Sequence, residues 1–224
     1  YRQFVKGVLY ETNAKTAEMC KLTENSFRDT NIAFANEISM ICDKLDINIW
    51  ELIKLTNKHP RVNILQPGTG VGGHCIAVDP WFIVSQDKKN SKLIRRSREV
   101  NNYKTTWVIN KIKDAASKFE SENKTKPKIA CLGLAFKPDI DDLRESTALT
   151  VCQTLIKKRY DISIVEPNIE TYKGLLISNT LEAIKTSDII CILVKHKEFM
   201  EKKILNKLKK SQVLDFCGAL KKYQ

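Results

Sequence analysis

The hydrophobic pattern changes its period across residues 121–127, and this change most limits what the chain can fold into. Before it, apolar side chains recur every three or four residues over two long stretches, 16–44 and 92–119, as in amphipathic helices. After it, short continuous apolar runs alternate with helical patterns. The segment between the two parts is polar and ends in proline, which is typical of a boundary. We therefore predict a helical domain at residues 1–122 and a second domain at residues 123–224.

The second domain has the pattern of an α/β fold. Its apolar runs resemble buried parallel strands, and helices separate them, so we predict a doubly wound, Rossmann-like parallel sheet. Ligands in such sheets bind beyond the carboxyl ends of the strands. The loop after the first strand lacks the Gly-x-Gly-x-x-Gly pattern of a dinucleotide site, so this domain is not an obvious NAD site. The expected strands are 129–134, 162–165, 189–194 and 213–216, and the expected helices are 146–159, 181–186 and 198–210.

Composition limits the compartment and the class of partner. Seven cysteines, an odd number, mostly inside apolar runs, predict free thiols in a reducing cytoplasm. No Cys-x-x-Cys or His-x-x-x-His spacing suggests a metal site, and no apolar run approaches the ~18 residues of a membrane span. The net charge of +12 is spread along the chain without a nucleic-acid-binding motif. We expect a solvated basic surface, with neither nucleic acid nor membrane as a partner.

A glycine-rich stretch at residues 68–80 carries the strongest chemical signal. Four glycines precede Cys75, and Asp79 and Pro80 follow it. The glycines are Gly68, Gly70, Gly72 and Gly73. Glycine permits positive φ and close approach of a ligand to the backbone. This pattern is typical of a loop that holds a reactive thiol, with an aspartate nearby that could orient water or a base. The alternative is a glycine-rich loop around a buried, inert cysteine.

The spacing of other polar residues does not by itself assign them a role. Lys21 and Asn25 are four residues apart and share one helix face, for which a solvated stripe is the default that spacing alone cannot overturn. Arg61 has the planar fork that suits phosphate or carboxylate, although an ordinary surface arginine is the default. Lys137 and Arg144, in the loop after the first expected strand, could hold phosphate.

Three motifs together resemble the UDP-glucose/GDP-mannose dehydrogenase family, in the family's order and over nearly the whole chain. They are AEMCKLTEN at 17–25, GGHCIAVDP at 72–80, and GLAFKPD at 133–139 with RES at 144–146. Within the family, residues 27–37, 59–65 and 74–81 are most similar to members that act on UDP-N-acetyl-D-mannosamine.

The resemblance implies an architecture and its partners. Family members have an NAD-binding Rossmann domain, a helical middle domain with a long dimerising helix, and a UDP-binding domain. This chain resembles the last two, so we expect a fragment that forms a homodimer through the helix at 16–44. NAD would be bound mainly by the missing domain, and we predict that this polypeptide alone has no dehydrogenase activity.

The resemblance also implies a four-electron oxidation of the sugar C6 alcohol to a carboxylate with two NAD. The Cys75 thiolate would add to the aldehyde, and the thiohemiacetal would be oxidised to a thioester that water hydrolyses. Because a free cysteine has a pKa of about 8.5, a nearby cation would favour the thiolate. Lys21 would supply that charge and stabilise the oxyanion, Asn25 would share this role by hydrogen bonding, and Asp79 would activate water.

Substrate contacts follow from the same resemblance. Backbone N–H groups at the loop glycines Gly70, Gly72 and Gly73 would contact the sugar or the diphosphate. Lys137 and Arg144 would hold the UDP-sugar. Arg61 could reach the UDP-sugar across a dimer. One position departs from the family. Many members have an arginine two residues after the aspartate of the last strand, where this chain has Cys217 after Asp215.

Two alternatives stay open. One is another UDP-sugar 6-dehydrogenase, such as UDP-glucose dehydrogenase. The other is a non-catalytic dimerisation and UDP-sugar-binding module.

Overall fold

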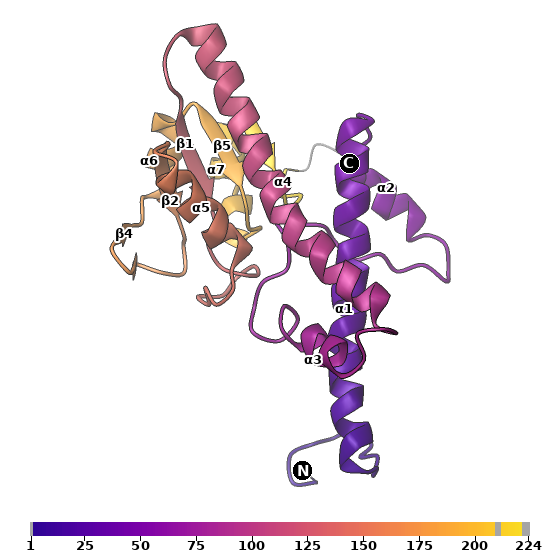
Figure 1. Ribbon diagram of the computed structural model, residues 1–224. Coiled ribbons are helices and arrows are strands. Elements are labelled where there is room, and N and C mark those ends of the chain that lie inside the picture. The colour runs from indigo at the N-terminus through magenta and orange to yellow at the C-terminus, as the bar shows by residue number, and fades with distance from the viewer. Residues whose placement is uncertain (1, 209–211, 221–224) are drawn as a thin grey trace.

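Two long helices dominate the N-terminal half of the computed structural model, which describes residues 2–208 and 212–220. Helix α1 (Ala14–Lys44) begins at Asn13, whose side chain accepts the N–H of Thr16 at 2.9 Å, a typical N-cap. Helix α4 (Lys92–Asn123) packs against α1 and then runs obliquely across the sheet (Figure 1). Helices α2 (Ile49–Thr56) and α3 (Asp79–Gln86) pack against α1.

The seam between α1 and α4 is polar. The Asp29 carboxylate accepts hydrogen bonds from Arg98 Nη1 at 2.6 Å and Asn101 Nδ2 at 2.7 Å. Asn36 Nδ2 donates to Asn101 Oδ1 at 2.9 Å, and all four side chains are buried. Burial raises the pKa of Asp29, and the charge of Arg98 offsets this only in part. A buried ion pair therefore joins the two helices.

The apolar residues that predicted α1 do not all face this seam. Met19, Ile41 and Leu45 are 46%, 46% and 60% exposed, whereas the buried side of α1 carries mainly small and polar side chains. The helix was correctly predicted, but its periodicity did not show which face packs on α4.

The C-terminal half is the predicted doubly wound α/β domain. Its sheet has four parallel strands in the order β2-β1-β5-β6. Helices α4 and α5 cover one face, and α6, α7 and a 3-10 helix, η1, cover the other. The bounds are β1 (Lys128–Leu132), α5 (Thr147–Lys157), β2 (Asp161–Val165), α6 (Thr180–Thr186), β5 (Ile189–Ile192), η1 (Lys197–Met200), α7 (Lys202–Leu208) and β6 (Gln212–Asp215).

Three details differ from the sequence predictions. The helix expected at 198–210 is divided into η1 and α7, because Glu201 is extended with ψ of 139°; residues 209–210 lie outside the described part. Two short strands, β3 (Thr171–Tyr172) and β4 (Leu175–Leu176), form an antiparallel pair that is too short to leave a pattern. Helix α4 continues past the expected end at 119 to Asn123.

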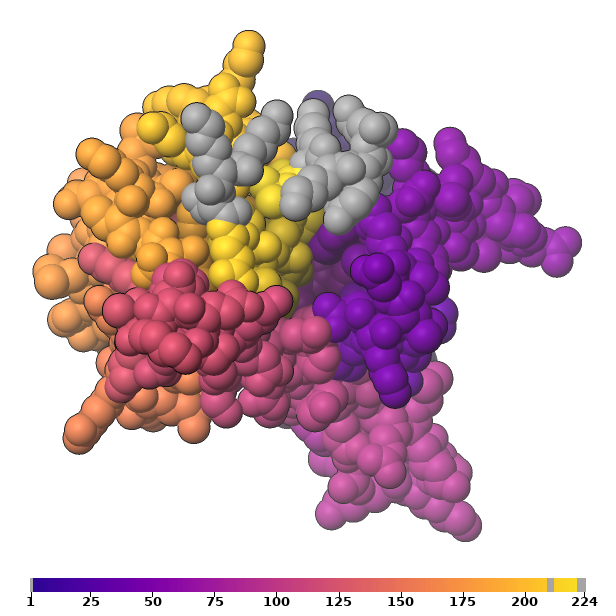
Figure 2. All heavy atoms as spheres, turned by 90° about the horizontal axis from the view of Figure 1, so that it is seen from above, coloured from indigo at the N-terminus to yellow at the C-terminus, as the bar shows by residue number. Residues whose placement is uncertain are grey.

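Helix α4 belongs to both halves of the molecule. Its residues Val108, Ile112 and Ala116 lie in the hydrophobic core of the sheet domain, while its earlier turns pack on α1. Seen from above, the C-terminal elements gather on one side and α1 with α2 on the other (Figure 2). The boundary at 122/123 stays a prediction, since a single helix connects the two parts.

None of the described helices combines the length and apolar composition needed to cross a membrane. All seven cysteines are free thiols.

Candidate functional site

The glycine-rich loop is anchored to both halves of the molecule. The Gly68 N–H donates to Asn36 Oδ1 on α1 at 2.9 Å, and Thr105 Oγ1 on α4 donates to the Thr69 carbonyl at 2.9 Å. Thr69 Oγ1 also lies 2.7 Å from Thr147 Oγ1 at the start of α5. The loop therefore has a fixed position between the helical part and the sheet domain.

Close packing explains why the loop needs glycine. At Gly70, φ is +136° and a Cβ would lie 2.6 Å from Thr105 Oγ1; at Gly73, φ is +83° and a Cβ would lie 2.9 Å from the Phe136 ring. A Cβ at Gly72 would overlap the Glu145 carbonyl. The Gly73 N–H donates to the Arg144 carbonyl at 3.1 Å, so in this arrangement it cannot donate to a ligand as expected.

Cys75 is exposed, so the alternative of a buried, inert cysteine is wrong. It lies in the turn that leads into α3, and its carbonyl accepts the N–H groups of Val78 at 3.0 Å and Asp79 at 2.8 Å. Cys75 and Asp79 are therefore the two ends of one helix-like turn, four residues apart.

A pocket of ≈ 380 Å³ brings most of the predicted residues together. Lys21 and Asn25 come from α1, Cys75 from the glycine-rich loop and Lys137 from the loop after β1, and the three loop glycines also line it (Gly70, Gly72 and Gly73). Asn25 Nδ2 donates to Asp79 Oδ2 at 2.5 Å, which fixes Asp79 beside the pocket. The catalytic roles of these residues stay predictions, but the residues do lie at one site.

Lys21 lines the pocket, but its partner in this structure is an acidic residue of its own helix. Its ammonium pairs with Glu24 at 3.2 Å, and both side chains are about two-thirds exposed, at 65% and 66%. An exposed ion pair contributes little to stability. The ammonium can therefore leave Glu24 for a negative charge in the pocket at small cost.

Arg144 and Arg61 do not line this pocket. The Arg144 guanidinium makes a bidentate pair with Asp142, with an Nη2–Oδ2 distance of 2.6 Å. Hydrogen bonds from Arg144 lower the pKa of Asp142 to about 2, and the same pairing raises the pKa of Arg144. Arg61 is exposed in the loop after α2. The substrate-binding role of both arginines stays a prediction.

Sequence reasoning missed Arg28 and did not assign a role to Phe136. Both line the pocket. Arg28 lies seven residues after Lys21 and three after Asn25, so its place on the same helix face could have been found from spacing. The side chain of Phe136 packs under Gly73, which depends on tertiary structure.

A buried Glu166–His196 pair holds the strand ends beside the pocket. Glu166 Oε2 accepts the N–H groups of Leu134 at 2.7 Å and Ala135 at 3.0 Å, and lies 3.1 Å from His196 Nε2. Burial opposes ionisation of Glu166, but the hydrogen bonds from His196 and Leu134 outweigh it and lower the pKa of the carboxyl. Both side chains are almost fully buried.

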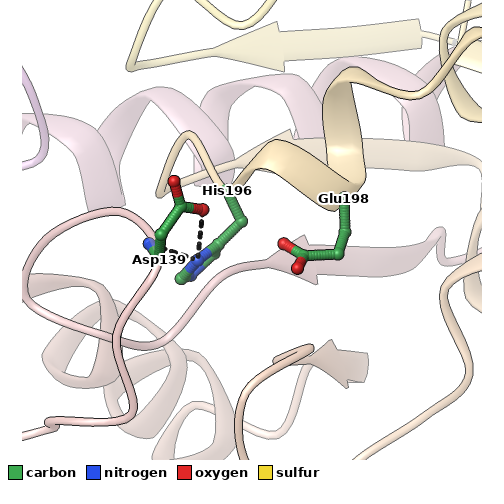
Figure 3. A group of neighbouring side chains, drawn as sticks. All are labelled: Asp139, His196 and Glu198. Atoms are coloured by element: carbon green, nitrogen blue, oxygen red, sulfur yellow. Dashed lines mark hydrogen bonds and ion pairs between the residues drawn. The ribbon is translucent and has the colours of Figure 1, made fainter.

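His196 also faces Asp139 and Glu198 (Figure 3). This trio has the spacing of a metal site, but His196 Nδ1 already accepts the Asp139 N–H at 3.0 Å. That hydrogen bond occupies the lone pair a metal would need and places the ring proton on Nε2, toward Glu166. These contacts indicate that the imidazole has a structural role, linking Asp139 and Glu166.

The same contacts do not fit NAD in this sheet. In dinucleotide folds, an acidic residue after the second strand binds ribose, and a glycine turn follows the first strand. Here Glu166 follows β2 but points inward to Leu134 and Ala135, and the turn after β1 carries Phe136 and Lys137 instead.

Comparisons with known proteins agree with this arrangement. Residues 15–103 match the UDP-glucose/GDP-mannose dehydrogenase family, central domain, and residues 130–222 match the UDP binding domain of the same family. UDP-N-acetyl-D-mannosamine dehydrogenase from Campylobacter jejuni is 53% identical over 97% of this chain and 53% of its own length. An NDP-N-acetyl-D-galactosaminuronic acid dehydrogenase from Ralstonia nicotianae is 50% identical over 97% of this chain and 51% of its own length.

Solved structures are similar too. UDP-N-acetyl-mannosamine dehydrogenase from Staphylococcus aureus has a TM-score of 0.84 at 38% identity, covering 99% of this chain and 52% of that one. UDP-D-ManNAc dehydrogenase from Pyrococcus horikoshii has a TM-score of 0.85 at 36% identity, covering 99% and 53%. The chain spans about half the length of these relatives. With both family domains matched in order, the chain belongs to the UDP-glucose/GDP-mannose dehydrogenase family.

Proposed function

We propose that this chain supplies the catalytic cysteine and the UDP-sugar-binding part of a UDP-N-acetyl-D-mannosamine 6-dehydrogenase. The observation that carries the proposal is the pocket in which exposed Cys75 faces residues from both halves of the chain, Lys21 and Lys137 among them. The identity of 53% to a UDP-N-acetyl-D-mannosamine dehydrogenase supports the choice of substrate.

The proposed reaction converts the C6 alcohol of the sugar to a carboxylate in two oxidation steps, each of which would use one NAD as the acceptor of two electrons. At the aldehyde stage, the Cys75 thiolate attacks the carbonyl carbon and forms a thiohemiacetal. Removal of a hydride from this carbon and of the hydroxyl proton, two electrons and two protons in total, gives a thioester. Water then attacks the thioester, releasing the carboxylate and regenerating the thiolate.

The neighbouring residues suit these steps. Lys21 can exchange its exposed pairing with Glu24 for the oxyanion that forms when the thiolate adds. Asn25 holds the Asp79 carboxylate in place, and Asp79 takes a proton from the hydrolytic water. Lys137 contacts the diphosphate from the sheet side of the pocket.

In this proposal the sheet described above does not bind NAD, because Glu166 already accepts the backbone N–H groups of the turn after β1. We therefore keep the prediction that this polypeptide by itself has no dehydrogenase activity and that NAD is held elsewhere in the complete enzyme. Its proposed location is the cytoplasm.

A second substrate has specific support. The 50% identity to an NDP-N-acetyl-D-galactosaminuronic acid dehydrogenase is close to the value for the mannosamine enzyme. A UDP-N-acetyl-D-galactosamine enzyme is thus the leading alternative, ahead of a UDP-glucose dehydrogenase or a non-catalytic binding module.

The substrate assignment can be tested by steady-state kinetics of the full-length enzyme that contains this chain. We expect kcat/KM for UDP-N-acetyl-D-mannosamine to exceed that for UDP-glucose and the other UDP-N-acetylhexosamines by at least about tenfold, or about 1.4 kcal/mol. A higher kcat/KM for UDP-N-acetyl-D-galactosamine would make that sugar the assigned substrate instead. Absence of turnover with every UDP-sugar, despite UDP binding, would favour the non-catalytic module.

The proposed partner is a second copy of this chain, which would bind along α1. Phe27, Phe34 and Ile41 are seven residues apart, so they form one stripe, and they are 68%, 53% and 46% exposed. An apolar stripe of this kind is typical of a helix that packs against a partner.

Phe34→Glu should convert the dimer to monomer, because the interface would have to bury an unpaired carboxylate. Light scattering coupled to size-exclusion chromatography measures this, and Phe82→Glu is the matched control, since Phe82 is similarly exposed (55%) but lies on α3. A monomeric wild-type chain, or a dimer that survives Phe34→Glu, would reject this interface.

A further inference from the structure

We propose that Lys195 is a second cation for the diphosphate of the UDP-sugar, acting together with Lys137. This inference rests on the proposed function and adds to it a residue that the sequence motifs did not indicate. Lys195 follows β5, whose carboxyl end lies between those of β1 and β6. Ligands of open parallel sheets bind at this edge.

On one side, the segment at 194–197 is fixed to the loop that carries Lys137. The Asp139 N–H donates to His196 Nδ1 at 3.0 Å, and the Lys197 N–H donates to Asp139 Oδ1 at 2.9 Å. Val194 packs directly on Gly133, where any Cβ would overlap it. The two lysine-bearing segments therefore cross the edge of the sheet side by side.

On its other side, β5 meets the end of β6. Ile192 pairs with Asp215 in the register, and the Ile192 carbonyl accepts the Phe216 N–H at 3.1 Å. Cys217 Sγ lies 3.7 Å from the same carbonyl. The end of β5, three residues before Lys195, is thus next to the position where many family members are expected to have arginine and this chain has an uncharged thiol.

A tight turn directs Lys195 outward. The His196 N–H donates to the Val194 carbonyl at 3.1 Å, an i to i+2 bond that closes a γ-turn around Lys195. Val194 and His196 are buried, whereas Lys195 is exposed. Within residues 2–208 and 212–220, its ammonium makes no hydrogen bond or ion pair, so it is available to an anion.

Lys195 interacts electrostatically with Cys217. Burial, together with the Asp215 charge, raises the pKa of this thiol, and the positive charge of Lys195 opposes the rise. A cation that acts on Cys217 from β5 can do the electrostatic work of an arginine at residue 217. A diphosphate held between Lys137 and Lys195 would then receive charge from two neighbouring strand ends.

Calorimetric titration of the 224-residue chain with UDP tests the proposal. We expect Lys195→Gln to weaken UDP binding about tenfold, as the loss of one charge-assisted contact implies. Lys207→Gln is the matched control. Lys207 is an exposed lysine in the last turn of α7, which leads to the start of β6 and so lies at the amino edge of the sheet. It should leave the affinity unchanged.

The double variant Lys195→Gln/Cys217→Arg should recover most of the lost affinity, because it returns a cation to the same edge. Equal affinity of wild type and Lys195→Gln would overturn the proposal, and so would equal losses in Lys195→Gln and Lys207→Gln. If wild type does not bind UDP at all, the proposed function itself fails. Thermal melting of each variant shows that any loss comes from binding and not from unfolding.

Discussion

Replacing Cys75 by alanine should lower the turnover of UDP-N-acetyl-D-mannosamine by at least about three orders of magnitude in the full-length enzyme. The reason is chemical: without the sulfur, no thioester can form between the two oxidation steps. NADH formation measures the effect. Cys20→Ala is the matched control, because Cys20 is the other exposed cysteine and lines a different surface of α1. Turnover that survives Cys75→Ala would exclude the thioester route.

The chain itself offers an independent readout of the same site. Cys20 and Cys75 are exposed and the other thiols are buried or partly buried, so brief alkylation should modify these two first. A UDP-sugar should protect Cys75 and leave Cys20 reactive, because only Cys75 lines the pocket with Lys21 and Lys137. Equal protection of both cysteines would argue against binding in this pocket.

Asp29→Ala should lower the free energy of unfolding by about 3–5 kcal/mol, the largest stability effect that we expect. The Arg98 guanidinium would stay buried between α1 and α4 without its 2.6 Å partner, and Asn101 would lose an acceptor. Urea unfolding measures the change as a lower midpoint at constant slope. Glu99→Ala, which breaks exposed pairs on the same helix, should shift the midpoint far less.

A double substitution separates pairing from packing. Asp29→Leu/Arg98→Met removes both charges and fills the space with apolar groups, so it should cost less than either single substitution. Among the residues that the structure describes, Asp29 Oδ2 and Arg98 Nε have no hydrogen-bond partner, which limits how much the pair itself stabilises. If the double variant were less stable than both single variants, the seam would depend on the charges themselves.

Much of the local structure could be predicted because its signals are local. Asn48 caps α2 and Ser146 caps α5 through side-chain oxygens that accept backbone N–H groups no more than three residues away. The buried strands were recognisable as continuous apolar runs. The break at Glu201 was not, because η1 is set by Phe199 packing fully buried on His196.

For the site, the candidate residues could be named from the sequence, but their arrangement in space could not. Residue types and glycine spacing identified Cys75, and a place in the loop after the first strand identified Lys137, whereas Lys21 and Asn25 were candidates only through the family resemblance. The four positions come from α1, the glycine-rich loop and the turn after β1. Nothing in the spacing between them fixes a distance in space. The pairing of Lys21 with Glu24 and of Arg144 with Asp142 could not be predicted either, since each arginine or lysine has several acidic neighbours.

The sequence by itself indicated the helices, the parallel sheet and Cys75 as the candidate nucleophile, because hydrophobic period, caps and glycine act over a few residues. Only the tertiary structure decided which face of α1 is buried, that Phe136 and Glu145 require glycine at 72 and 73, and that Lys195 emerges beside Cys217. Those outcomes depend on how α4 and the strand ends pack, and packing joins residues whose separation along the chain carries no information about their distance.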